Sequence, residues 1–173
     1  MCNTTLDYLS EKENNLILIV YGIQGTIEDK QKKLQIEGVY EAYKEVHRQY
    51  ANLAIESLEA LKRGLFIQWH VLVGACFVSG ISDIYPQAEY RIIEILDDKL
   101  SRNEVDPELY AMVSYYANEA WDFVYDRFPS FVNLKNLMSN KNTYDQIVKQ
   151  IKCSNLNNRG QMGIYWNSIV NRD

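Results

Sequence analysis

Residues 57–78 read SLEALKRGLFIQWHVLVGACFV, and the apolar positions in this segment recur with a helical period. They lie three or four residues apart, at Leu58, Leu61, Leu65, Trp69, Leu72 and Cys76. This spacing places the six side chains along one face of an α-helix. The early turns carry charges, whereas the later turns are almost wholly apolar. We therefore predict one amphipathic helix over residues 57–78 that runs into the centre of a hydrophobic core.

The uncharged part of this segment has a second interpretation, a membrane-spanning helix. Residues 64–82 contain no charged side chain over nineteen positions, and they follow Lys62 and Arg63. Basic residues in that position are typical of the cytoplasmic end of a span. However, three glycines and several polar residues interrupt the stretch, and its apolar face continues that of the charged turns before it. A buried helix explains both halves, so we predict no membrane span.

The chain on either side of this segment also reads as helical. Before it, Thr26 and Asp29 have the spacing of a capping box, and an apolar stripe follows from Ile36 to Ala54. After it, all three prolines mark helix starts, and Asp106 before Pro107 is typical of an N-cap. The predicted helices begin near seven residues: Thr26, Ser57, Pro86, Pro107, Phe131, Thr143 and Arg159.

Length and composition favour one domain over residues 1–173. The chain is 47% apolar and 24% charged, which is ordinary for a globular protein. We therefore expect an all-α domain of about seven helices, arranged as a helical bundle or as stacked helical hairpins. Residues 16–23 are rich in β-branched side chains and leave helix and strand open. We interpret them as a buried helical turn, because no second strand-like segment is present to pair with them.

Charge and cysteine content limit the classes of partner and compartment. A net charge of −5 has the wrong sign for binding nucleic acid through its phosphates. The three cysteines are widely spaced and odd in number, which indicates a reducing compartment rather than a disulfide framework. The first residues lack the basic region of a signal peptide. We therefore predict a cytoplasmic protein.

Catalytic and metal-binding motifs are scarce in this chain. It has two histidines, and none of the patterns HExxH, CxxC, GxSxG or a phosphate-binding glycine loop occurs. His70 follows Trp69 in the apolar segment and is interpreted as a core residue. We predict no enzyme activity, catalytic residue, metal or cofactor. The alternative is a helical enzyme or small-molecule-binding protein with a cavity near Trp69, His70 and Trp121.

The distribution of acidic residues is the most informative functional feature. Residues 83–126 contain eleven acidic and three basic side chains, a net charge of −8, whereas the rest of the chain sums to +3. Two adjacent helices with that charge repel each other, so core stability alone does not favour them. An acidic helical pair is suited to binding a basic protein, since its field accelerates association and fixes register.

Specific residues of this acidic pair are predicted to contact the partner. Tyr115, Glu119, Asp122 and Asp126 follow one another at helical spacing and share one face. Aromatic side chains beside carboxylates supply buried anchors for an interface. The predicted partner-binding residues are Tyr115, Glu119, Trp121, Asp122, Tyr125, Asp126, Glu94, Asp97 and Asp98. A purely solubilising acidic surface and a homo-oligomer are the alternatives.

Three segments also resemble a known group of proteins. Residues 59–70 (EALKRGLFIQWH), 79–83 (SGISD) and 159–167 (RGQMGIYWN) are similar to small helical bacterial immunity proteins that neutralise a cognate toxin. The resemblance covers about half of the chain. It implies a cytoplasmic, non-catalytic protein that binds and occludes a toxin domain, often a basic one. It assigns no contact residue to any position of this chain.

Overall fold

The computed structural model describes residues 5–120 and 127–171, and this part of the chain is helical without a strand. The helices of these residues are α1 (Leu6–Gly22), α2 (Ile27–Ile36), α3 (Val39–Leu53), α4 (Leu58–Val73), α5 (Cys76–Ser79), α6 (Pro86–Ser101), α7 (Pro107–Glu119), α9 (Val132–Ser139), α10 (Tyr144–Lys152) and α11 (Gly160–Val170). The predicted all-α class is confirmed. The predicted number of about seven is too low, because ten helices occur in the described residues.

One additional helix is α1 itself. Thr5 caps it by accepting a hydrogen bond from the backbone N–H of Tyr8 at 3.2 Å. Leu9, Leu16 and Val20 form its buried stripe. Residues 16–22, for which the sequence left helix and strand open, are the last turns of this helix. Their β-branched side chains are accommodated because the stripe is buried against α3, α5 and α11.

The other two additional helices arise where a glycine ends a predicted helix. Gly38 has φ +68°, a left-handed conformation that separates α2 from α3. Ile36, predicted to begin the α3 stripe, is 72% exposed as a result. Gly74 is extended and ends α4 at Val73, so residues 57–78 are not one helix. A Cβ at position 74 would collide with the His70 imidazole, which occupies that space.

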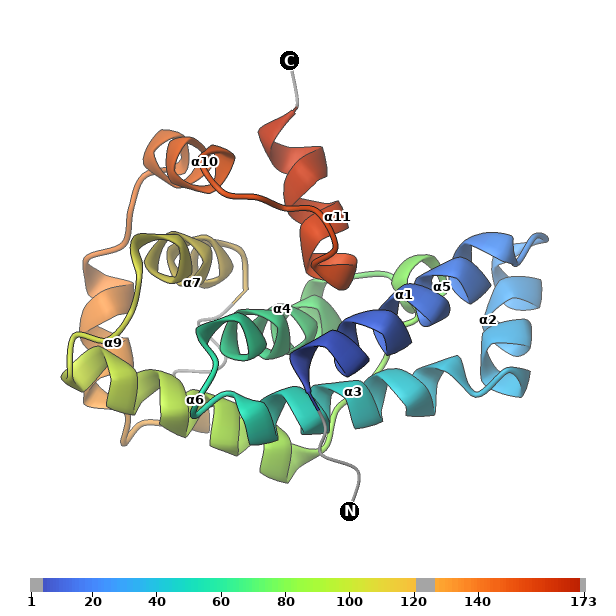
Figure 1. Ribbon diagram of the computed structural model, residues 1–173, viewed down its shortest axis with the longest axis horizontal. Helices are drawn as coiled ribbons and strands as arrows, with labels where there is room; N and C mark the ends of the chain where they lie inside the picture. The colour runs from blue at the N-terminus through green and yellow to red at the C-terminus, as the bar shows by residue number, and fades with distance from the viewer. Residues whose placement is uncertain (1–4, 121–126, 172–173) are drawn as a thin grey trace.

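The predicted central position of α4 is confirmed. Every residue from Ala60 to Trp69 is buried, and α4 packs against α3, α6, α7 and α11. Figure 1 shows α4 in the middle of the molecule, with α3 and α6 on one side and α7 and α11 on the other. Trp69 stacks on Tyr116 of α7 with ring centroids 4.8 Å apart. The core therefore joins the N-terminal and C-terminal halves of the chain.

The predicted helix starts are confirmed except at Pro129, which lies in the turn before α9. Thr26 and Thr143 each form a capping box, the first with Asp29 and the second with Gln146. Pro107 opens α7 directly after Asp106, whose carboxylate accepts from the N–H of Leu109 at 2.7 Å. Among the described helices, none has the length and apolar character needed to cross a membrane.

Candidate partner-binding site

Much of the acidic charge in residues 83–126 is neutralised by cations from other parts of the chain. Four of these carboxylates form ion pairs outside their own segment: Lys44–Asp83, Lys62–Asp106, Arg127–Glu89 and the pairs of Glu108 with Lys62 and Arg159. The charge asymmetry along the sequence is therefore smaller in space. Only the acidic residues that remain exposed are available to a partner.

The predicted contact residues of α7 occupy different environments. Tyr115 is buried, and its hydroxyl lies 2.6 Å from that of Tyr165 on α11. Glu119 is exposed at the last residue of the helix. These two residues therefore do not form an exposed row, because α7 is buried on nearly all sides between Leu109 and Ala117. The other predicted contacts of this segment, Trp121, Asp122, Tyr125 and Asp126, lie outside the described residues.

Asp97, a predicted contact on α6, has a structural role. Its carboxylate accepts from the backbone N–H of Leu134 at 2.8 Å and from the side-chain amide of Asn133 at 3.0 Å. Both donors lie in the first turn of α9, where backbone N–H groups have no partner within the helix. Asp97 therefore caps α9 and holds it against α6.

Glu94 and Asp98 are brought together at a surface cleft. They lie one turn apart on α6 and are both exposed. The cleft has a volume of about 500 Å³. We call it the acidic cleft, and its lining residues are Ile55, Glu94, Ile95, Asp98, Lys99, Arg102 and Glu104. It lies where the turn between α3 and α4 approaches the C-terminal half of α6.

The charges of the acidic cleft are only partly paired. Arg102 contacts Asp98 at 2.9 Å, and Lys99 lies 3.9 Å from Glu104. Glu94 has no ion-pair partner among the residues that the structure describes. Among the described lining residues, three carboxylates against two cations give the cleft a net negative charge, and Glu94 supplies the uncompensated carboxylate.

An apolar wall accompanies these carboxylates. Ile55 is 52% exposed, and Ile95 is buried at the back of the cleft. A lysine or arginine from another protein can place its aliphatic stem on such a wall and its cation beside Glu94. The arrangement therefore fits a basic side chain.

Five of the seven described residues that line the acidic cleft were not among the predicted contacts: Ile55, Ile95, Lys99, Arg102 and Glu104. Glu104 was counted among the acidic residues but was not assigned to the site. Ile55 lies in the turn after the predicted stripe, and its position beside α6 follows only from the packing of α3 on α6. No local pattern around Ile55 indicates that contact.

A second group of charged residues lies between α4, α7 and the start of α11. The Arg159 guanidinium contacts the carboxylates of Glu59 at 2.8 Å and Glu108 at 2.5 Å, and Lys62 also contacts Glu108. Arg63 donates to Glu59 at 2.7 Å. We call these five residues the ionic cluster: Glu59, Lys62, Arg63, Glu108 and Arg159.

The electrostatics of the ionic cluster indicate a structural role. Burial acts to raise the pKa of Glu108, but hydrogen bonds from Arg159 and Lys62 outweigh it and hold this pKa at about 2. A carboxyl group with that pKa stays ionised at neutral pH, which makes it a poor proton donor or acceptor there. The contacts of the ionic cluster link α4, α7 and the start of α11.

The residues named for the alternative cavity lie in aromatic packing. Trp69 contacts Phe66, Tyr115 and Tyr165 besides Tyr116, and His70 lies against Phe66 and Trp69. The third residue, Trp121, lies outside the described residues. Among the described residues, aromatic rings therefore pack around Trp69.

The described residues define an all-helical protein with an acid-lined cleft at the surface. The chain matches no protein-family model, no curated protein and no solved structure.

Proposed function

We propose that this protein is a non-catalytic protein-binding domain that holds a basic partner at the acidic cleft. The observation that carries the proposal is the exposed carboxylate of Glu94, uncompensated by any described cation and set beside the exposed side chain of Ile55. The resemblance to immunity proteins supports the most concrete form of this function. In that form the partner is a basic toxin domain, and binding occludes its active site.

The acidic cleft supports both fast association and a stable complex. The uncompensated carboxylate of Glu94 attracts a basic surface before contact and accelerates the encounter. After contact, an apolar wall buries the stem of the incoming lysine or arginine, and residues of that kind are frequent anchors of interfaces. Glu94 and Ile55 supply these two contributions side by side.

The test begins with capture of the partner and then measures its binding kinetics. The tagged protein is incubated with its native lysate, and bound proteins are eluted with stepped salt and identified by mass spectrometry. The association rate of the purified partner is then measured for wild type and Glu94→Lys. We expect Glu94→Lys to slow association by about tenfold at low salt, because it replaces an attractive charge by a repulsive one.

The matched control is Glu37→Lys, which makes the same change in net charge. Glu37 is exposed directly after the last turn of α2. Figure 1 shows α2 at the opposite end of the molecule from the C-terminus of α6. If the charge must lie in the acidic cleft to affect binding, the association rate of Glu37→Lys should stay within about twofold of wild type. Equal rates for the two variants, or a captured partner without a basic surface, would contradict the proposal. Circular dichroism establishes that both variants are folded.

A further inference from the structure

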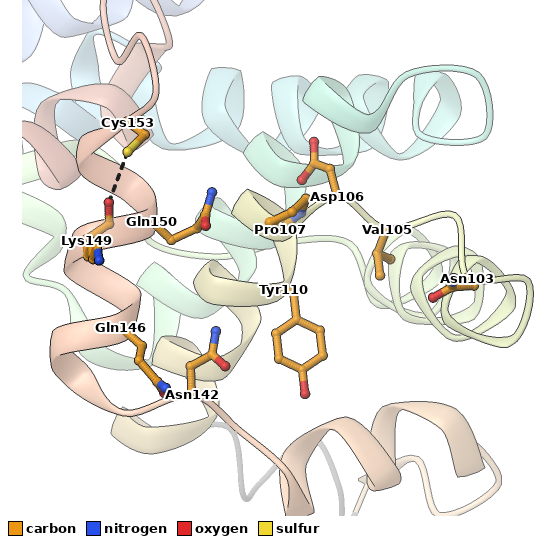
Figure 2. Close-up of a pocket in the computed structure, with 10 residues that line it drawn as sticks. All are labelled: Asn103, Val105, Asp106, Pro107, Tyr110, Asn142, Gln146, Lys149, Gln150 and Cys153. Carbon is orange, nitrogen blue, oxygen red and sulfur yellow. Dashed lines mark hydrogen bonds between the residues drawn. The ribbon is translucent and has the colours of Figure 1, made fainter.

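A second surface groove lies between α7 and α10, and four of its ten described lining residues carry side-chain amides (Figure 2). Its volume is about 600 Å³. We call it the amide groove and define it by Asn103, Tyr110, Asn142, Gln146, Gln150 and Cys153. Neither the predicted contacts nor the proposed binding of a basic side chain accounts for it.

The amides on the α10 side are regularly spaced. Asn142, Gln146 and Gln150 follow one another at intervals of four residues, and the last two lie on α10. Four residues of α-helix rise about 6 Å, which is close to the distance of about 6.7 Å between alternate residues of an extended strand. Gln146 and Gln150 are therefore separated by a distance that approximates the repeat of an extended polypeptide, and Asn142, which precedes the N-cap Thr143, lines the same groove.

Most of the hydrogen-bonding capacity of these three amides is unused among the described residues. The side-chain oxygen of Gln146 accepts from the backbone N–H of Thr143 at 2.9 Å, which leaves its NH₂ group available. The side chains of Asn142 and Gln150 make no hydrogen bond to any described residue. A primary amide offers both a donor and an acceptor and is thus complementary to the N–H and C=O of a main chain.

The opposite wall of the groove is rigid and partly apolar. Tyr110 on α7 donates its hydroxyl proton to the carbonyl oxygen of Asn140 at 2.8 Å, which fixes the ring. Val105 and Pro107 extend this wall. An extended chain directs alternate side chains to opposite faces, at right angles to its N–H and C=O groups, so every second side chain can contact the apolar residues of the groove while the main chain pairs with the amides.

The amide groove carries little net charge of its own. Asp106, at its edge, is already bonded to the ammonium of Lys62 and to the backbone N–H of Leu109. Among the described lining residues, Lys149 is the one other charged side chain. Recognition through main-chain hydrogen bonds suits such a groove better than recognition of a charged ligand.

The amide groove and the acidic cleft share one loop. Arg102 and Glu104 line the cleft, whereas Asn103 and Val105 line the groove, so alternate residues of the loop between α6 and α7 serve the two sites. Asn103 has φ +57°, which makes this loop turn sharply. A partner held at the cleft is therefore adjacent to the groove.

We infer that the amide groove binds an extended segment of the partner protein, with its main chain paired to Asn142, Gln146 and Gln150. The assignment of the segment to that partner rests on the proposed function, whereas the chemistry of the groove does not. The ligand class is an extended, largely uncharged polypeptide.

The test uses random twelve-residue peptides displayed on phage and selected against the full-length protein, so that it needs no knowledge of the partner. Selected peptides are synthesised, and their affinities are measured for wild type, Gln150→Ala, Gln35→Ala and Glu94→Lys. We expect Gln150→Ala to weaken binding by about tenfold, because one donor and one acceptor are lost. Gln35 is an exposed amide on α2, and Gln35→Ala serves as the matched control.

The thiol of Cys153 reports directly on occupancy of the groove, since it is exposed in the groove lining. Bound peptide should slow its reaction with Ellman's reagent at least fivefold, and Cys153→Ser gives the background from the other thiols. Absence of selected peptides, equal affinities for Gln150→Ala and Gln35→Ala, or unprotected Cys153 would overturn the inference. Protection by oligosaccharides in place of peptides would do so as well.

The two proposals fail separately. Glu94→Lys should leave peptide affinity within about twofold of wild type, because Glu94 lines only the acidic cleft. If peptides bind in the groove but Glu94→Lys does not alter association of the captured partner, the proposed function fails and the groove remains. If Glu94→Lys slows association of the partner but Gln150→Ala leaves peptide affinity unchanged, only the inference about the groove fails.

Discussion

Among single residues, His47 is unusual because it is a titratable side chain within the hydrophobic core. It is fully buried on α3, and neither ring nitrogen has a hydrogen-bond partner among the described residues. Burial lowers the pKa of His47 to about 4, against an opposing effect of Gln68 on α4. The imidazole is therefore neutral in the folded protein at pH values where an exposed histidine is already charged.

This difference makes folding stability depend on pH in a defined window. Above pH 6.5 the ring is neutral in both the folded and the unfolded chain and has no effect on the pH dependence. As the pH falls from 6.5 toward 4, His47 becomes protonated in the unfolded chain but stays neutral in the folded chain. We expect the contribution of His47 to stability to fall by about 2 kcal/mol between pH 7.5 and pH 5.

The check is urea unfolding of wild type and His47→Leu at both pH values. Leucine is apolar and similar in size, so it removes the titration without opening a large cavity. Between pH 7.5 and pH 5, the free energy of unfolding should fall by about 2 kcal/mol more in wild type than in His47→Leu. Equal losses in the two proteins would show that His47 does not cause the pH dependence.

At the scale of secondary-structure elements, helix starts were predictable and several helix ends were not. A start is marked by neighbouring residues that bond to one another, such as Thr26 with Asp29. A glycine, by contrast, has different effects in different places. Gly64 lies inside α4, where it allows Ile92 of α6 to approach closely, whereas Gly74 ends the same helix. Only the tertiary surroundings distinguish these two positions.

Gly38 provides a quantitative test of a helix end. Its φ of +68° is strained for any residue with a Cβ, yet a Cβ there would meet no atom within 4 Å. Gly38→Ala should therefore destabilise the protein by about 1 kcal/mol through backbone strain alone. Urea unfolding measures the change in the free energy of unfolding.

The matched control is Gly22→Ala at the last residue of α1. Space around Gly22 is equally open, and its backbone is helical. Alanine there should be neutral or stabilise by up to about 1 kcal/mol. A similar destabilisation of both variants would contradict the argument from φ.

At the scale of the whole molecule, the sites are assembled from distant segments. The acidic cleft joins Ile55 to residues that lie about forty to fifty positions later, and the contact between Glu59 and Arg159 spans 100 positions. The sequence identified Glu94 and Asp98 because acidic residues are visible without a fold. It did not show which of the other carboxylates have internal cations, because pairing depends on the complete packing.

The segment 159–167, one basis of the resemblance, is explained by this long-range packing. Arg159 anchors the ionic cluster, and Gly160 has φ +60° directly against the Glu13 carboxylate. Glu13 accepts from the backbone N–H of Gln161 at 2.9 Å and from the Tyr50 hydroxyl at 2.8 Å. These residues attach the start of α11 to α1 and α3, so a structural requirement accounts for them.

Arg159 is therefore expected to matter more for stability than any exposed basic residue. Arg159→Met keeps much of the side-chain volume but leaves the carboxylates of Glu59 and Glu108 with fewer cations. Since both partners are largely buried, we expect a loss of about 3 kcal/mol. Arg102→Met, which breaks an exposed pair with Asp98, should cost less than about 1 kcal/mol.

Acid titration distinguishes loss of charge pairing from loss of packing in Arg159→Met. In wild type the pKa of Glu108 is about 2, below its ordinary value of 4.5, so the stability it contributes is complete above pH 4.5 and declines as the pH falls toward 2. Without Arg159 the pKa of Glu108 rises toward 4.5, so Glu108 contributes less stability at neutral pH and less is lost on acidification. Unfolding measured from pH 7 to pH 3 should therefore show a shallower decline for Arg159→Met than for wild type. Parallel declines would mean that Arg159 stabilises the fold through its packing and not through its charge.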